Sequence, residues 1–217
     1  MPSLTQPRSS ETGDPDSTIL IPDTAYLDRV RRVLGIITLD PCSSAKCQVA
    51  VSAQTWYRSD QAQGALAQGW SGNIFLHPHP NSTIARRQVQ KLLRDYLTGR
   101  VTSAIILSGR IDLLRQEPLI QSFPHLIHWK RLRHWRWVSP ELGLQALNPS
   151  FNSLSIGLPA KNALTYSEEW FDNFRSCFSS YGRIIIPEDI DQQWQTEAMA
   201  ATRSWPIKPV LTALRER

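Results

Sequence analysis

Two histidines alternate with two prolines directly after a short apolar run, as His77, Pro78, His79 and Pro80. The run before them, residues 73–76 (Asn-Ile-Phe-Leu), predicts a short strand, so the histidines are expected in a proline-restricted loop at its carboxyl end. A neutral imidazole accepts a hydrogen bond through its unprotonated nitrogen, and a pair of imidazoles can share a metal ion. The residues therefore indicate either a polar binding site or a proline-rich turn whose histidines are solvated.

A metal ion held by His77 and His79 would need at least one further ligand. Asp112, Cys42 and His125 carry suitable donor atoms, but their spacing is not diagnostic of a metal site. We therefore expect no metal, and a metal-dependent hydrolase that uses His77 and His79 is kept as a third alternative.

Asp40 is another polar residue with a possible chemical use. It follows an expected strand over residues 36–39 and precedes Pro41. A carboxylate at the carboxyl end of a strand can accept hydrogen bonds from ribose hydroxyls, as in dinucleotide-binding folds. An aspartate before a proline is also a common turn residue, so the residues alone leave both roles open.

A run of aromatic and basic residues occupies positions 129–137 (Trp-Lys-Arg-Leu-Arg-His-Trp-Arg-Trp). If the run is a single strand, alternate side chains share one face, and these are Trp129, Arg131, Arg133, Trp135 and Trp137. Aromatic rings interleaved with arginine are typical of surfaces that bind nucleic acid. The alternative is an ordinary strand with packed rings and solvated arginines.

Three segments carry a resemblance to a known family: Leu39-Asp40-Pro41, the stretch 70–82, and Pro-Ser-Phe-Asn-Ser-Leu-Ser-Ile-Gly at 149–157. Their layout resembles the phage-type DNA N6-adenine methyltransferases (Dam-like) over about residues 20–187. In that family a tetrapeptide of Asp or Asn, two prolines and an aromatic residue follows a strand. Its first side chain and a nearby backbone carbonyl accept hydrogen bonds from the amine of a flipped adenine, and the ring stacks on the base. Here only Pro78 keeps the family's letter.

The resemblance implies S-adenosylmethionine as the cofactor, held by Asp40 and Pro41, and DNA as the partner. It places catalysis at His77, Pro78, His79 and Pro80, by direct methyl transfer to adenine. The changed letters remove the stacking ring, which favours loss of the ancestral activity over its retention. Two functions follow: an adenine methyltransferase with reduced or lost activity, or a non-catalytic DNA-binding protein on the same fold.

Composition agrees with a nucleic-acid partner without requiring one. The chain has 217 residues, a formal net charge of +5 and 24 basic residues, of which 19 are arginine. Three cysteines without a paired motif indicate neither a disulfide framework nor a zinc ribbon. No apolar stretch approaches the roughly 20 residues of a membrane-spanning helix, and we expect a cytoplasmic protein of prokaryotic or phage origin. The oligomeric state stays open.

The order of expected elements predicts an α/β fold, a single Rossmann-like domain over residues 19–190 with helices flanking its sheet. Residues 1–18 are expected to be a disordered tail, and 191–217 a helical or irregular one. Helices are expected at 23–34, 82–98 and 168–178, and strands at 36–39, 73–76, 101–107, 125–129, 132–137, 151–158 and 182–186. A long loop with short structured pieces is expected after Asp40, up to about Gly72.

Overall fold

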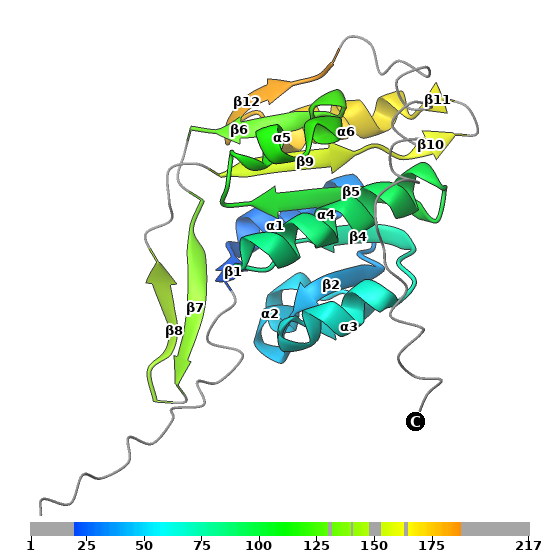
Figure 1. The fold of residues 1–217 in the computed structure, drawn as a ribbon. Helices are drawn as coiled ribbons and strands as arrows, with labels where there is room; N and C mark the ends of the chain where they lie inside the picture. Colours follow the sequence, from blue (N-terminus) through cyan, green and yellow to red (C-terminus); the bar gives the residue numbers. More distant parts are fainter. Residues whose placement is uncertain (1–19, 130–131, 140, 148–152, 163–164, 188–217) are drawn as a thin grey trace, which may run out of the picture.

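A computed structural model describes residues 20–129, 132–139, 141–147, 153–162 and 165–187 of the chain. The expected tails, 1–18 and 191–217, lie outside the described residues, and the expectation of a single domain stays a prediction. The described part is a mixed α/β structure in which helices cover a seven-stranded sheet on both faces (Figure 1).

Four neighbouring strands of this sheet run parallel in the order β3-β2-β4-β5. Their bounds are Leu39–Ser43 for β2, Thr55–Arg58 for β3, Gly72–Leu76 for β4 and Val101–Ser108 for β5. The sequence predicted β4, the helix after it and β5 as one parallel unit, and the β4–β5 pairing confirms this.

Three further strands continue the sheet beyond β5 in the order β9-β6-β12. They are β6 (His125–His128), β9 (Leu154–Leu158) and β12 (Gly182–Ile185). Because β9 is antiparallel to both β5 and β6, β6 runs in the same direction as the four parallel strands. Strands β2, β3, β4, β5 and β6 therefore all end at one edge of the sheet, which we call the carboxyl edge; the opposite edge is the amino edge.

One face of the sheet is covered by α1 (Thr24–Leu34), α2 (Ala45–Val51) and α6 (Glu168–Phe178). The predicted start of α1 is confirmed, because the Asp23 side chain accepts a hydrogen bond from the Ala25 amide at 2.9 Å. Apolar residues of α1 and α6 pack on Phe75 and Ile105 of the sheet. Burial of this apolar stripe fixes the helices on the face.

The other face carries α3 (Ala62–Ala67), α4 (Ser82–Leu97) and α5 (Leu113–Gln116), with 3-10 turns η2 (Ser59–Gln61) and η3 (Pro118–Ser122). The N-cap of α4 is Asn81, whose side chain accepts from the amides of Thr83 and Ile84, whereas the sequence indicated Ser82 or Thr83 as the cap. The side chains of α4 that pack into the core include Val89, Leu92 and Tyr96.

A smaller antiparallel sheet stands across the carboxyl edge (Figure 1). It consists of β1 (Leu20–Pro22), β7 (His134–Ser139) and β8 (Gly143–Leu147), in the order β1-β7-β8. We call β7 and β8 together the ribbon. A separate two-stranded pair joins β10 (Lys161–Asn162) to β11 (Thr165–Tyr166).

The structure differs from the sequence prediction mainly between residues 36 and 72. The expected strand at 36–39 begins later, since β2 is Leu39–Ser43 and Ile36 is exposed. The expected long loop holds α2, β3, η2 and α3, which are short and weakly patterned. Among the described helices, none has the length and apolar character needed to cross a membrane.

Candidate functional site

The chain changes direction across the sheet between β2 and β4. From β2 it moves outward to β3, then returns past β2 to β4 and continues to β5. In open α/β sheets, ligands bind at the carboxyl ends of the strands beside such a switch point. Leu39 of β2 pairs with Ile74 of β4, so Asp40 lies level with Phe75, two residues before His77 on the neighbouring strand.

Both residues also lie on the same side of the sheet. Leu39 and Leu76 belong to the core under α4, so alternation turns Asp40, and His77 after the strand, towards the α1 face. Their contacts agree, because Asp40 meets Gln48 of α2 and His77 meets Leu20 just before α1.

Asp40 is 2 % exposed and is held by neutral donors. Its Oδ1 accepts from the Cys42 amide at 3.3 Å, and its Oδ2 accepts from Gln48 Nε2 at 2.9 Å. Burial raises the pKa of Asp40 to about 6, although these bonds and one from Ser43 act in the opposite direction. A carboxyl group with a pKa this close to neutrality is a candidate for function.

The expectation that Asp40 follows a strand is wrong, since Asp40 is the second residue of β2. Pro41, which is buried, comes next within the strand. Because a proline has no amide hydrogen to donate, the pairing of β2 with β3 is irregular between Asp40 and Ser43. This irregularity lies at the switch point, beside the carboxyl group.

His77 is half-buried, and its ring has a defined tautomer. Its Nδ1 lies 3.0 Å from the Leu20 carbonyl oxygen, and a carbonyl only accepts, so Nδ1 carries the hydrogen. Burial, and then the proximity of His134, lower the pKa of His77 to about 3. At neutral pH the ring is therefore uncharged and its Nε2 is a hydrogen-bond acceptor.

Two further histidines are linked to His77, since His134 lies beside it and His128 lies near His134. The His134 ring stacks on His77 with centroids 5.4 Å apart and planes 27° apart, and its Nδ1 donates to the Leu132 carbonyl. His128 bonds Ser155 Oγ at 2.8 Å, and burial with the nearby His134 lowers its pKa to about 4. Sequence reasoning missed His128 and His134, because they lie in separate strands, β6 and β7, and no spacing pattern joins them to His77.

His79 has a different role from His77. Its Nδ1 accepts from the Asn81 amide at 3.0 Å, and its own amide donates to Gln88 Oε1 at 2.9 Å. Burial lowers the pKa of the His79 ring. These bonds fix the entry of the chain into α4, so His79 is a loop-forming residue in this structure.

His77 and His79 both follow β4, which ends at Leu76, and their rings contact different partners. Within the described ranges, no group of three His, Cys, Asp or Glu side chains is placed to hold a metal ion. The hydrolase alternative therefore has no ligand set in this part of the chain.

A concavity lies where the loop after β4, the start of α4 and the segment after β5 meet. Pro78 forms part of its wall, and Pro80 lies outside it and is exposed. The residues that line the concavity are Pro78, Ser82, Ala85, Arg86, Ser108, Arg110, Leu113 and Gln116. Both arginines are held by acids, Arg86 by Glu117 and Arg110 by Asp112.

The run 129–137 does not form one strand, in agreement with the separate strands expected at 125–129 and 132–137. β6 ends at His128 and β7 begins at His134, so Trp129 and Trp135 do not share one strand. Trp129 is 67 % exposed directly after β6, at the carboxyl edge, whereas half-buried Trp135 packs near Cys47 of α2. Arg133 is exposed just before β7, and Arg131 lies outside the described residues.

The resemblance requires an aromatic ring that stacks on a base, and Phe75 of β4 is fully buried and cannot stack in this way. His134 is also buried beneath His77. Among the described residues, Trp129 is a large aromatic residue at the carboxyl edge, and its exposed ring can stack.

Comparisons with family models, curated proteins and solved structures found no match to this chain.

Proposed function

We propose that the chain is a DNA adenine N6-methyltransferase-like protein that uses S-adenosylmethionine. The observation that carries the proposal is the placement of Asp40 and His77 on one side of the sheet, at the switch point between β2 and β4. The resemblance assigns the cofactor to Asp40 and the target amine to His77. The strand order, with reversed β9 beside the parallel strands, supports a Rossmann-like methyltransferase sheet.

Asp40 suits the cofactor role in charge and place. Its carboxylate is held by amide and hydroxyl donors, so a ribose hydroxyl can replace such a donor without breaking an ion pair. Because Asp40 is 2 % exposed, the Gln48 side chain has to turn aside for a ligand to reach it. S-adenosylmethionine supplies an electrophilic methyl group on a sulfonium when bound.

His77 suits the amine role because its tautomer is fixed. Leu20 holds the hydrogen on Nδ1, which leaves the Nε2 lone pair to accept a hydrogen bond from an exocyclic amine. Burial keeps the ring neutral, and a protonated ring could not accept this bond. In the family that this chain resembles, a nearby backbone carbonyl provides a second acceptor. The carbonyls around Pro78 would have this role here.

DNA as the partner is supported by exposed groups at the same edge. Trp129 and Arg133 lie there, beside the ends of β6 and β7. An exposed indole can stack on an unpaired base, and an exposed guanidinium can contact phosphate.

One observation favours a second function, a non-catalytic DNA-binding protein on this fold. Asp40 is enclosed by Gln48, Ser43 and the Cys42 amide, and His77 is stacked on His134. A carboxylate and an imidazole that have become structural would give the same contacts.

Methyl transfer from labelled S-adenosylmethionine to unmethylated DNA separates the two functions. The methyltransferase account predicts transfer by the wild type, a loss of about a hundredfold in His77→Ala, and partial rescue in His77→Asn, which keeps an acceptor. Asp172→Asn, at a residue exposed on α6, is the matched control and should keep wild-type activity. No transfer by a wild type that binds DNA would favour the non-catalytic function.

A further inference from the structure

The ribbon has two faces with different surroundings. Trp135 lies near Cys47 of α2, and the Trp137 ring lies 4.0 Å below the Lys46 ammonium, also of α2. By strand alternation, His134 and Arg136 occupy the opposite face. We call this second face the site face, because its His134 stacks on His77.

The site face presents two side chains suited to reading bases. Arg136 of β7 pairs directly across the ribbon with Gln145 of β8, so both side chains project from the same face. Both are exposed, and neither side chain makes a hydrogen bond or ion pair with the described residues. Arginine makes paired hydrogen bonds with guanine, and glutamine makes them with adenine.

Charge and shape favour duplex DNA as the occupant of this face. The described residues that share it are His134, Arg136, Val138, Gln145 and Leu147, none of them acidic. The nearest acid of the ribbon, Glu141, lies in the turn between the strands. A two-stranded antiparallel ribbon fits the major groove of B-DNA.

The spacing along β7 fits a reading of neighbouring base pairs. Two residues of a strand span about 7 Å, so Arg136 lies about that far from His134, which stacks on His77. Successive base pairs rise by about 3.4 Å, so the side chains would reach positions one to three base pairs from a base held at His77.

We propose that the ribbon enters the major groove and reads the base pairs next to the target adenine through Arg136 and Gln145. This inference rests on the proposed function and names how its DNA partner is recognised.

The test is selection of bound duplexes from a pool with a randomised centre, followed by sequencing. Arg136→Ala should lose a guanine preference and Gln145→Ala an adenine preference, each by about 5- to 150-fold, within three base pairs of the selected adenine. Arg133→Ala should weaken binding to all sequences alike, as loss of a phosphate contact does. Arg32→Ala is the matched control, because Arg32 is exposed in the last turn of α1, which leads to the amino edge. Thermal melting confirms that each variant is folded.

Each remaining outcome overturns the inference. If wild type selects a sequence and the Arg136 and Gln145 variants select it equally well, the ribbon does not read it, and the proposed function is unaffected. If wild type binds duplexes without preference, or binds none, no sequence reading exists at this face. Methyl transfer and S-adenosylmethionine binding, measured separately, then decide the proposed function.

Discussion

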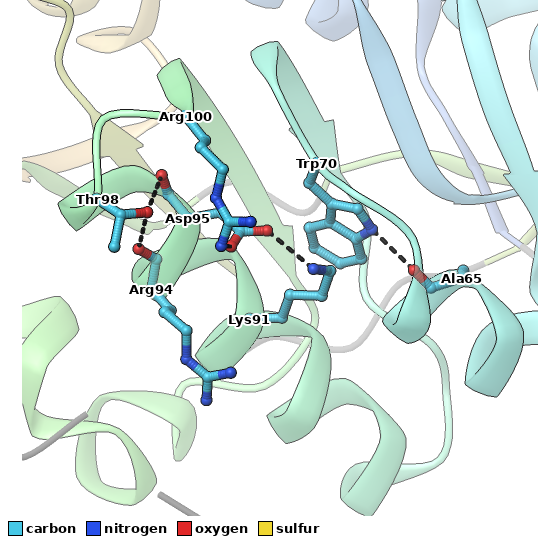
Figure 2. Close-up of polar contacts among 7 residues, drawn as sticks. All are labelled: Ala65, Trp70, Lys91, Arg94, Asp95, Thr98 and Arg100. Atoms are coloured by element: carbon cyan, nitrogen blue, oxygen red, sulfur yellow. Dashed lines mark hydrogen bonds and ion pairs between the residues drawn. The ribbon is translucent and has the colours of Figure 1, made fainter. Parts of the chain in front are cut away.

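Two aspartates of this chain are equally buried but have different partners. Asp95 of α4 is 1 % exposed, and Asp40 of β2 is 2 % exposed. Figure 2 shows Asp95 between two cations, with Lys91 Nζ at 2.9 Å from Oδ2 and Arg100 bonded to Oδ1. The hydrogen bonds to Asp40 come from neutral groups.

The position in the sheet explains the contrast. Asp95 lies near the end of α4, beside the start of β5, at the amino edge, where Lys91 also lies 5.2 Å from the Trp70 ring. There the carboxylate joins α4 to the start of β5. Asp40 lies within β2, and the described residues place no cation beside it, so its buried charge opposes folding and makes it a candidate for function. Comparison of the two residues thus separates a structural acid from a candidate functional one.

The largest expected effect is at the structural acid. Asp95→Ala leaves Lys91, whose side chain is 14 % exposed, without its anion, and the free energy of unfolding should fall by about 3 kcal/mol or more. Arg100 adds little to this loss, because its side chain is 54 % exposed. Urea unfolding measures the change, with the exposed Asp172→Ala as a control that should leave the midpoint unchanged. If Asp95→Ala lowers the free energy of unfolding as little as the control does, Asp95 is not a structural acid and the contrast with Asp40 fails.

Asp40 should respond in the opposite direction. Asp40→Asn removes the buried charge, so the free energy of unfolding at pH 8 should rise, by up to about 3 kcal/mol for a pKa raised from 3.8 to about 6. The raised pKa means that the folded protein binds the proton of the Asp40 carboxyl group more tightly than the unfolded chain does. The wild-type free energy of unfolding therefore falls as the pH rises. The stabilisation from the protonated acid is complete below about pH 4 and is lost as the pH rises through 6.

The measurement is the difference between the wild-type and Asp40→Asn stability curves from pH 4 to pH 8, obtained by urea unfolding. The variant should gain on the wild type as the pH rises. A constant difference, or a loss of stability like that of Asp95→Ala, would show that the Asp40 charge is compensated.

His77 gives a smaller effect in the acid range. Burial lowers the pKa of His77 to about 3, so the stability linked to its neutral form is present above about pH 6.5 and is lost as the pH falls through 3. His77→Gln, which cannot be protonated, should reduce the acid-induced loss by about 2 kcal/mol. Thermal melting between pH 7 and pH 5 tests this, and parallel wild-type and variant profiles would contradict it.

The smallest effect concerns the loop that joins the site to α4. Asn81→Ala removes the cap on the Thr83 and Ile84 amides and should cost about 1 kcal/mol. Asn81→Asp keeps the acceptor and should retain stability. If both variants unfold at the wild-type midpoint, the start of α4 does not depend on this cap.

Sequence patterns predicted the elements with long apolar periodicity. Asp23 and the stripe of α1, the β4–α4–β5 unit and α6 were predicted because single helices and strands carry their own caps and periods. The short α2, α3 and β3 were missed, since tertiary packing stabilises elements of this length more than local preference does.

The candidate site shows the same limit. His77 could be selected from sequence because it directly follows a strand, whereas Asp40 was selected from an expected strand end and lies second in β2. The contacts that give them chemistry, Gln48 on Asp40 and His134 on His77, join different elements and have no local signature. The division of residues 125–137 into β6 and β7 was predicted, because two separate β-prone segments were expected at 125–129 and 132–137.

The most direct test of the account is calorimetry of S-adenosylmethionine binding to the wild type and to Asp40→Asn, with Asp172→Asn as the control. We predict binding by the wild type and the control, and an affinity at least about tenfold lower in Asp40→Asn, because a charged acceptor contributes about 1.5 to 3 kcal/mol. An absence of binding heat at millimolar ligand, or equal affinity in wild type and Asp40→Asn, would contradict the assignment of Asp40 to the cofactor.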